Sequence, residues 1–188
     1  MRLWFHLLPP GRGSPLWRVV GKVRKTSPIS LRRRAAHPAV DPPDPCVPFL
    51  FDTDAISEVL RKRPAASYLQ WLARIPPVQQ FTSAVVVGEL YKGAFRSPDP
   101  ELHVTNIETR VLSAVTVLPF DVAAARIYGE IEAGLSTRGQ SLEDADLRIA
   151  ATAICHGLEV VTGNLRHFER IPGIRLNRAL AEARQAPS

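Results

Sequence analysis

Val47-Pro48-Phe49-Leu50-Phe51 is an apolar run that ends abruptly at the polar triplet Asp52-Thr53-Asp54. A short apolar run bounded by polar residues is typical of a buried β-strand. In an open parallel α/β sheet, the carboxyl ends of the strands form the floor of the ligand crevice. We therefore expect Asp52 to point into a functional site, where a charge is costly to bury and a metal ion would offset the cost.

A second apolar run, late in the chain, ends in a similar way. Glu159-Val160-Val161-Thr162 is followed by Gly163-Asn164, a turn that carries an oxygen-bearing side chain. If both runs are parallel strands of one sheet, Asp52 and Asn164 supply oxygen ligands to the same edge.

Strand-like and helix-like segments alternate from residue 47 onward. Such alternation predicts an α/β fold in which helices cover both faces of a parallel sheet. The expected strands are 48–52, 78–82, 115–118 and 159–162, with a fifth at 174–176 on the edge. The expected helices are 55–60, 66–74, 83–95, 101–113, 122–137 and 141–156. A domain of this size buries about two thirds of its unfolded surface, which is enough for a core of its own.

The first 46 residues differ from the rest in composition. They hold nine of the 24 lysines and arginines, only two acidic residues and eight of the 17 prolines. Their net charge is +7, whereas the remaining 142 residues carry 15 basic and 16 acidic side chains. The high isoelectric point is therefore no argument for a basic, nucleic-acid-binding face on the domain.

We predict three regions: a disordered, basic, Pro/Arg-rich leader at 1–46, a folded domain at 47–178 and a C-terminal tail at 179–188. Three interpretations of the leader stay open. It precedes the true translation start, which is favoured because no methionine follows Met1 and the domain pattern begins at Val47. Alternatively, it is an organelle transit peptide, or an arm that binds nucleic acid.

The cysteines and histidines exclude several kinds of site. Cys46 and Cys155 provide neither a disulfide framework nor a Cys-x-x-Cys motif, which fits a cytoplasmic protein. The five histidines lack the spacing of zinc ligands, and we expect surface or capping roles for them, His167 included. No run approaches the ~18 apolar residues of a membrane span, so no membrane association is expected.

Two further acids stand in apolar helical surroundings. Glu89 ends the first half of a helix that begins near Ser83, and Asp146 precedes a small, apolar helix surface within 147–151. A buried carboxylate without a partner costs several kcal/mol, so each acid needs a cation nearby. For Glu89, Lys92 at i+3 is the structural alternative to a metal ion.

Asp144, although close to Asp146, has a simpler explanation. Ser141 and Asp144 fit a capping box at the start of a helix. Asp144 can also pair with Arg148 at i+4. We expect Asp144 to be structural.

The order of these motifs resembles that of the PIN-domain ribonucleases, and most closely their VapC-type toxin branch. The likeness runs from about Val47 to Leu176, and residues 1–46 have no counterpart. Each motif is short, but four of them in this order form a specific pattern. They are Phe49-Leu50-Phe51-Asp52-Thr53; Thr82-Ser83 with Gly88-Glu89-Leu90 and Gly93; Asp146-Leu147-Arg148-Ile149-Ala150-Ala151-Thr152-Ala153; and Val160-Val161-Thr162-Gly163-Asn164 with Phe168 and Ile171-Pro172-Gly173.

The resemblance implies a PIN-like, three-layer α/β/α fold whose central parallel sheet has four to five strands. It implies that Asp52, Glu89 and Asp146 gather in one pocket, as the catalytic residues and as ligands of Mg²⁺ or Mn²⁺. Both ions are hard cations that prefer oxygen ligands.

Three other residues receive roles by the same resemblance. Asn164 stands near the position of a fourth acid that is common in the family, and its neutral amide would be a weaker ligand for a second ion. Thr53 and Ser83 would support the ligands or hold water, with helix capping as the alternative.

For function, the resemblance implies a metal-dependent endoribonuclease, the toxin of a type II toxin–antitoxin pair. Its implied partners are an RNA substrate, a VapB-type antitoxin and a second copy of the chain. A catalytically weak RNA- or metal-binding PIN module is the alternative, and metal-dependent cleavage of RNA distinguishes the two. A third hypothesis, a phosphotransfer receiver, lacks a suitably placed lysine after a late strand. Uptake of a small phosphoryl donor at Asp52 would support it.

Overall fold

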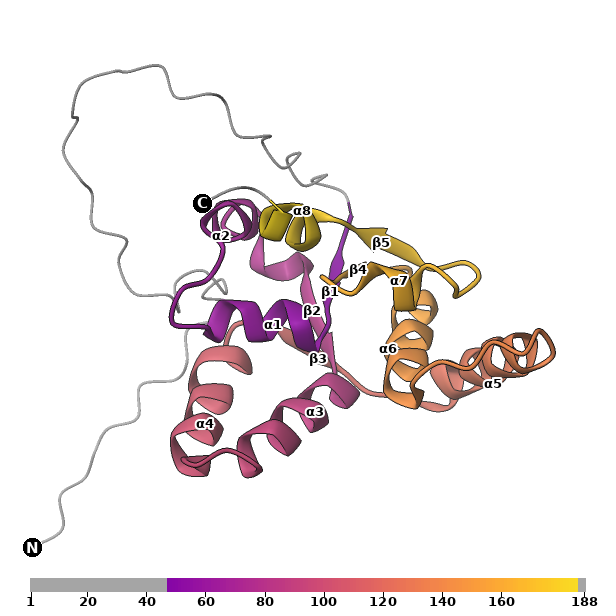
Figure 1. Ribbon diagram of the computed structural model, residues 1–188, viewed down its shortest axis with the longest axis horizontal. Coiled ribbons are helices and arrows are strands. Elements are labelled where there is room, and N and C mark those ends of the chain that lie inside the picture. The colour runs from indigo at the N-terminus through magenta and orange to yellow at the C-terminus, as the bar shows by residue number, and fades with distance from the viewer. Residues whose placement is uncertain (1–46, 186–188) are drawn as a thin grey trace, which may run out of the picture.

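A five-stranded, wholly parallel sheet forms the centre of the protein, with strand order β3-β2-β1-β4-β5. The computed structural model describes residues 47–185. Figure 1 shows helices α1 and α2 on one side of the sheet and α5 and α6 on the other. The three-layer α/β/α arrangement with five strands is thereby confirmed, whereas the leader at 1–46 lies outside the described residues.

The elements follow the expected order. The strands are β1 (Phe49–Phe51), β2 (Gln80–Ser83), β3 (Thr116–Leu118), β4 (Glu159–Val161) and β5 (Arg175–Asn177). The helices are α1 (Thr53–Leu60), α2 (Ala66–Leu72), α3 (Ala84–Phe95), α4 (Pro100–Asn106), α5 (Val122–Ser136), α6 (Asp144–Cys155), α7 (Leu165–Phe168) and α8 (Ala179–Gln185). A 3₁₀ turn covers Pro77–Gln79, and a π-helical turn covers Ile107–Val111.

The run that suggested the fold is the central strand. In β1, Leu50 lies opposite Phe81 of β2 on one side and Val160 of β4 on the other. Phe49, Leu50 and Phe51 are all buried, since helices cover both faces of the sheet. A strand buried on both faces reads as an unbroken apolar run rather than an alternating one.

The strand order reverses beside β1. The chain runs outward from β1 to β2 and β3, and then crosses back to β4 on the other side of β1. The carboxyl ends of β1 and β4 therefore flank a topological switch point, the usual ligand crevice of such sheets. Asp52 directly follows β1, and Asn164 comes shortly after β4.

Several boundaries differ from the prediction. Pro76 and Pro77 favour a 3₁₀ turn, so β2 begins at Gln80 rather than at 78. Helix α6 begins at Asp144 rather than at 141, and its N-cap, Glu143, makes no side-chain cap bond. The expected capping box is wrong because the Asp144 carboxylate is engaged elsewhere: it accepts from the Tyr128 hydroxyl (2.7 Å) and pairs with Arg148 (2.7 Å).

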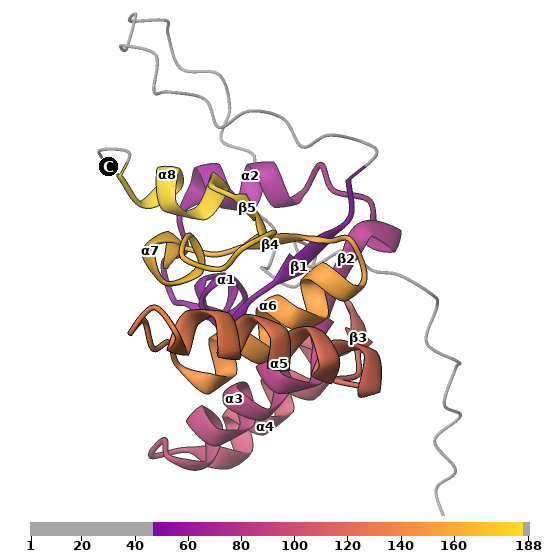
Figure 2. The same ribbon diagram turned by 90° about the vertical axis from the view of Figure 1, so that its right-hand side faces the viewer.

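The C-terminal residues form structure where a tail was expected. Helix α8 occupies Ala179–Gln185, and its Leu180 is fully buried. Both views place α8 beside α2 (Figures 1 and 2). At the other end of the molecule, α3 and α4 lie side by side in both views. No helix within 47–185 has the length and apolar character needed to cross a bilayer.

Candidate metal centre

Asp52 lies at the end of β1 and is also the N-cap of α1. Its Oδ1 accepts a hydrogen bond from the backbone N–H of Ala55 at 2.7 Å. The residue is only 5% exposed. Burial raises the pKa of the Asp52 carboxyl to about 7; hydrogen bonds from Thr162 and Ala55 oppose this, and the nearby charges of Asp54 and Asp146 add to it. A carboxylate in this position gains from a cation more than an exposed one does.

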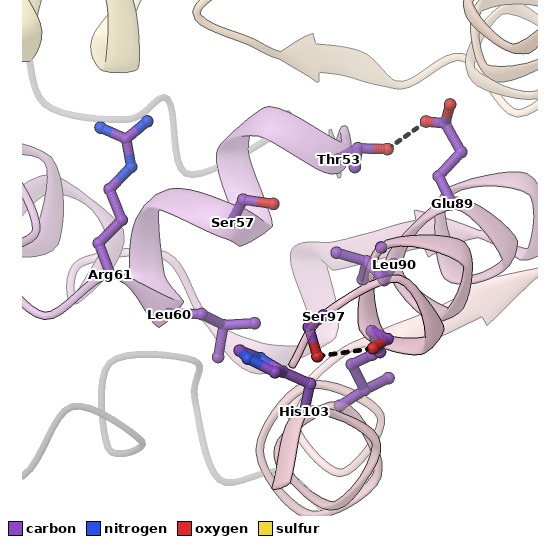
Figure 3. A pocket seen from close by; sticks show the side chains of 11 residues that line it. Thr53, Ser57, Leu60, Arg61, Glu89, Leu90, Ser97 and His103 are labelled. Carbon is purple, nitrogen blue, oxygen red and sulfur yellow. Dashed lines mark hydrogen bonds between the residues drawn. The ribbon is translucent and has the colours of Figure 1, made fainter. Parts of the chain in front are cut away.

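Glu89 projects from α3 toward α1. The hydroxyl of Thr53, on the first turn of α1, donates a hydrogen bond to the Glu89 carboxylate (Figure 3). Among the ion pairs of residues 47–185 none joins Glu89 to Lys92, so the structural alternative for Glu89 is not realised there. Thr53 thus orients Glu89.

Asp146 lies in the first turn of α6 and meets residues that follow β4. Its Oδ2 is 3.1 Å from Nδ1 of His167, and the same Nδ1 is 2.8 Å from the amide nitrogen of Asn164. Burial raises the pKa of the Asp146 carboxyl, while the hydrogen bond and the charge interaction with His167 act in the opposite direction. Asp146 and Asn164, 18 positions apart in the chain, are therefore linked through one imidazole nitrogen.

One cavity of about 360 Å³ brings these side chains together. Asp52, Glu89, Asp146, Asn164 and Thr53, all expected at the site, line it. The remaining lining residues are Asp54, Ser57, Glu143, Ile149 and His167. The cavity therefore holds five acidic side chains at the carboxyl end of the sheet, where the switch point predicts a ligand.

Ser83, the sixth residue expected at the site, is fully buried and does not line this cavity. Its hydroxyl accepts a hydrogen bond from the backbone N–H of Val86 at 3.2 Å, as the N-cap of α3. This is the capping alternative named for Ser83. By holding the start of α3, Ser83 helps to place Glu89 one and a half turns further along the same helix.

The donor set fits a hydrated divalent cation. Carboxylate and amide oxygens are the ligands that hard ions prefer, and such ions keep several waters in an open cavity. Within the described range, no three His, Cys, Asp or Glu side chains stand close enough to form a compact ion cluster by themselves. The arrangement suits an ion that completes its coordination with water and phosphate rather than a closed structural site.

Sequence reasoning missed two residues at this site. His167, expected at the surface or as a cap, lies in the cavity; its i, i+3 spacing from Asn164 could have indicated that the two share one face of a turn. Arg184, in the expected tail, binds Asp54 through Nη1 at 2.6 Å and Nη2 at 2.8 Å. It also binds the buried Glu58.

A second cavity, of about 390 Å³, adjoins the first between α1, α3 and α4. Figure 3 shows it from close by, with Leu60, Leu90 and His103 around its apolar part. Thr53, Ser57 and Glu89 line both cavities. The groove between α1, α3 and α4 therefore adjoins the acidic cavity.

Comparison with known proteins gives concordant results. A model of the PIN domain matches residues 49–174. The chain is 36% identical to "Ribonuclease VapC2" of Haemophilus influenzae over 129 residues, which is 68% of this chain and 94% of the relative. It is 34% identical to "tRNA(fMet)-specific endonuclease VapC" of Salmonella typhimurium over 128 residues, which is 68% of this chain and 95% of the relative.

Solved structures show the same fold. The DNA-bound VapBC structure from Salmonella typhimurium matches with a TM-score of 0.64 and 34% identity, covering 69% of this chain and 96% of that one. FitAcB from Neisseria gonorrhoeae matches with a TM-score of 0.63 and 30% identity, covering 70% and 97%. The matched segment contains Asp52, Glu89, Asp146 and Asn164. Sequence, fold and acidic cavity agree, and the chain belongs to the PIN-domain family.

Proposed function

We infer that this chain is a VapC-type ribonuclease, the toxin of a toxin–antitoxin pair, which cleaves RNA at the acidic cavity. The observation that carries this inference is the convergence of Asp52, Glu89 and Asp146 from three separate segments on one cavity at the switch point. Relatives at 34–36% identity are named as ribonucleases or endonucleases, and they are matched over nearly their whole length. The phosphotransfer receiver has no support from these relatives.

We assign Mg²⁺ or Mn²⁺ to Asp52, Glu89 and Asp146. These three residues would hold the ion, which would supply activation of an attacking water and neutralisation of charge on the leaving oxygen of a phosphodiester. The chain's own contribution is orientation: the bond from Ala55 fixes Asp52, and the Thr53 hydroxyl fixes Glu89. Side chains fixed in this way do not need to reorganise when the substrate phosphate arrives.

The partners follow from the same family and from the groove. Relatives were solved as VapBC and FitAcB complexes, and we assign to this chain a VapB-type antitoxin that covers the acidic cavity. The groove between α1, α3 and α4 offers apolar surface next to carboxylates, which suits an amphipathic segment with a basic side chain at the acidic end. We further assign a homodimeric assembly and a cytoplasmic location.

RNA cleavage by the purified full-length chain tests the function. We expect cleavage of total cellular RNA with Mg²⁺ or Mn²⁺ and none with a chelator. Asp52→Asn, Glu89→Gln and Asp146→Asn should each abolish cleavage, since each removes a charged ligand. Asp144→Asn is the matched control for Asp146→Asn. It makes the same change on the same helix, α6, at an exposed residue whose partners are Tyr128 and Arg148. Cleavage that survives in all three site variants would disprove the assignment.

A further inference from the structure

As the Asn164 amide is assigned, its contact and that of Asp146 require opposite roles of His167 Nδ1 in a neutral ring. Nδ1 carries either a proton or a lone pair, so it cannot both accept from the Asn164 amide nitrogen and donate to the Asp146 carboxylate. The two ends of an amide are assigned from their surroundings, and Asn164 can be turned so that its oxygen faces Nδ1. An imidazole nitrogen, a carboxylate oxygen and an amide oxygen then converge.

The spacing of these atoms is that of neighbouring ligands on one ion. Nδ1 is 2.8 Å from the Asn164 amide and 3.1 Å from Asp146 Oδ2. An octahedral cation with bonds of about 2.1 Å places adjacent ligand atoms about 3 Å apart. With the imidazole proton on Nδ1, that nitrogen donates to both oxygens. With the proton on Nε2, Nδ1 instead brings a lone pair within 2.8 and 3.1 Å of two acceptor groups, and a cation in place of the proton would offset their repulsion.

The backbone holds His167 in this position. Helix α7 is a single turn, and its next residue, Phe168, is 1% exposed and anchors the turn in the core. On the other side, the backbone N–H of Asn164 donates to the Thr162 hydroxyl at 2.9 Å, which fixes the start of the turn. Side chains of Asp146 and His167 remain 17% and 29% exposed, so an ion can reach them from the cavity.

We propose that His167 is itself a metal ligand, and that its Nδ1, the Asn164 amide oxygen and an Asp146 carboxylate oxygen hold a divalent cation next to the position served by Asp52. This proposal rests on the metal-dependent function proposed above and adds one nitrogen ligand to it. Since imidazole suits Mn²⁺ better than Mg²⁺, His167 shifts the preference of the site toward Mn²⁺. Asn164 and His167 are both neutral, and only the imidazole nitrogen of His167 is a softer ligand than a carboxylate oxygen.

Mn²⁺ binding to the full-length protein tests the proposal directly. Calorimetric titration with Mn²⁺ and then with Mg²⁺ gives the ratio of their affinities, and pulsed electron paramagnetic resonance of bound Mn²⁺ detects coupling to an imidazole ¹⁴N. We expect ¹⁴N coupling in the wild type and its loss in His167→Gln. Mn²⁺ affinity should fall about tenfold in that variant, with a smaller fall for Mg²⁺.

His156→Gln is the matched control, because His156 is an exposed histidine at the C-cap of α6. It should keep the ¹⁴N coupling and both affinities. Melting temperatures of both variants show whether the fold is retained. His167→Glu replaces the imidazole with a carboxylate, an oxygen ligand that Mg²⁺ prefers, and should recover Mg²⁺ binding.

The outcomes separate this proposal from the proposed function. If bound Mn²⁺ shows no ¹⁴N coupling, or if His167→Gln binds Mn²⁺ as the wild type does, the histidine ligand is overturned. RNA cleavage that is lost in Asp52→Asn would in that case still support the ribonuclease. If the wild type neither binds Mn²⁺ nor cleaves RNA, both proposals fail.

Discussion

Arg184 and Asp54, 130 positions apart in the chain, form a two-point ion pair with contacts of 2.6 and 2.8 Å. The same guanidinium reaches Glu58, whose side chain is 3% exposed, at 2.8 Å. Asp54 lines the acidic cavity, so helix α8 neutralises one of the cavity's acids and ties the C-terminal residues to α1.

Arg184→Ala should destabilise the protein by roughly 2 to 3 kcal/mol, because it leaves the buried Glu58 with Arg61 as its remaining ion-pair partner. The loss of stability should be smaller than for a fully buried ion pair, since the Arg184 side chain is 29% exposed. Urea denaturation measures the change. Arg178→Ala is the control: its pair with Glu169 is exposed on both sides, and we expect less than about 1 kcal/mol.

Gly163→Ala should also destabilise the fold, through the same pair. A Cβ at Gly163 would overlap Nη1 of Arg184 and Oδ2 of Asp54. The ion pair would have to open or the turn after β4 would have to move. The control is Gly93→Ala on α3, where nothing lies within 4 Å of an added Cβ and alanine favours the helix. Equal stability of Gly163→Ala and the wild type would show that the pair is not held as tightly as its geometry indicates.

Asp52→Asn should stabilise the metal-free protein at pH 8 by about 2 to 4 kcal/mol, since burial raises the pKa of Asp52 from 3.8 to about 7. The ionised form is disfavoured in the folded state, so the wild type gains stability from this group as the pH falls from about 7 toward 4. The advantage of the variant should therefore fall to roughly two fifths of its pH 8 value at pH 5, and approach zero only below about pH 4. Thermal unfolding with a chelator, at both pH values, measures it.

Asparagine keeps the N-cap, so the comparison isolates the charge of Asp52. The control is Asp99→Asn, an N-cap aspartate of α4 that is exposed and whose carboxylate stays hydrated. Its effect should be small at both pH values. A stabilisation of Asp52→Asn that does not depend on pH would contradict the assigned cause.

Asn164→Asp should tighten Mg²⁺ binding at some expense of stability without metal. The change adds a negative charge beside Asp146 and His167, and divalent affinity rises with ligand charge. Calorimetric titration at fixed pH and ionic strength compares the two forms. Asn106→Asp, on α4 and away from the acidic cavity, is the control. Unchanged affinity in Asn164→Asp would mean that this side chain does not face the ion.

The order of elements and the position of Asp52 were predictable from the chain itself. A strand buried on both faces produces an unbroken apolar run, and the polar residue after it marks the strand end. Glu89 and Asp146 were different, since nothing in their spacing brings α3 and α6 to the same cavity. The family resemblance placed them, and the structure shows them lining one cavity.

Helix α8 and the contact between His167 and Asp146 were not predictable, for a common physical reason. A seven-residue helix is too short to be stable alone and depends on tertiary packing, here the burial of Leu180 and the pairing of Arg184. His167 gains its role from a single turn that shows no hydrophobic period. In both cases the deciding contact joins residues far apart in the chain, so it cannot be predicted from the local sequence pattern.

The strand order also determines at which point of chain synthesis the catalytic site of this toxin is complete. Chain synthesis proceeds from the N-terminus, and β1 has β2 as its sole neighbour in the sheet until β4, at Glu159–Val161, leaves the ribosome. Asp146 and His167 are made equally late. A nascent chain therefore carries Asp52 and Glu89 on an incomplete sheet until β4 has been made. The complete site forms only after the chain has emerged past His167, so an antitoxin can meet each new molecule as its site forms.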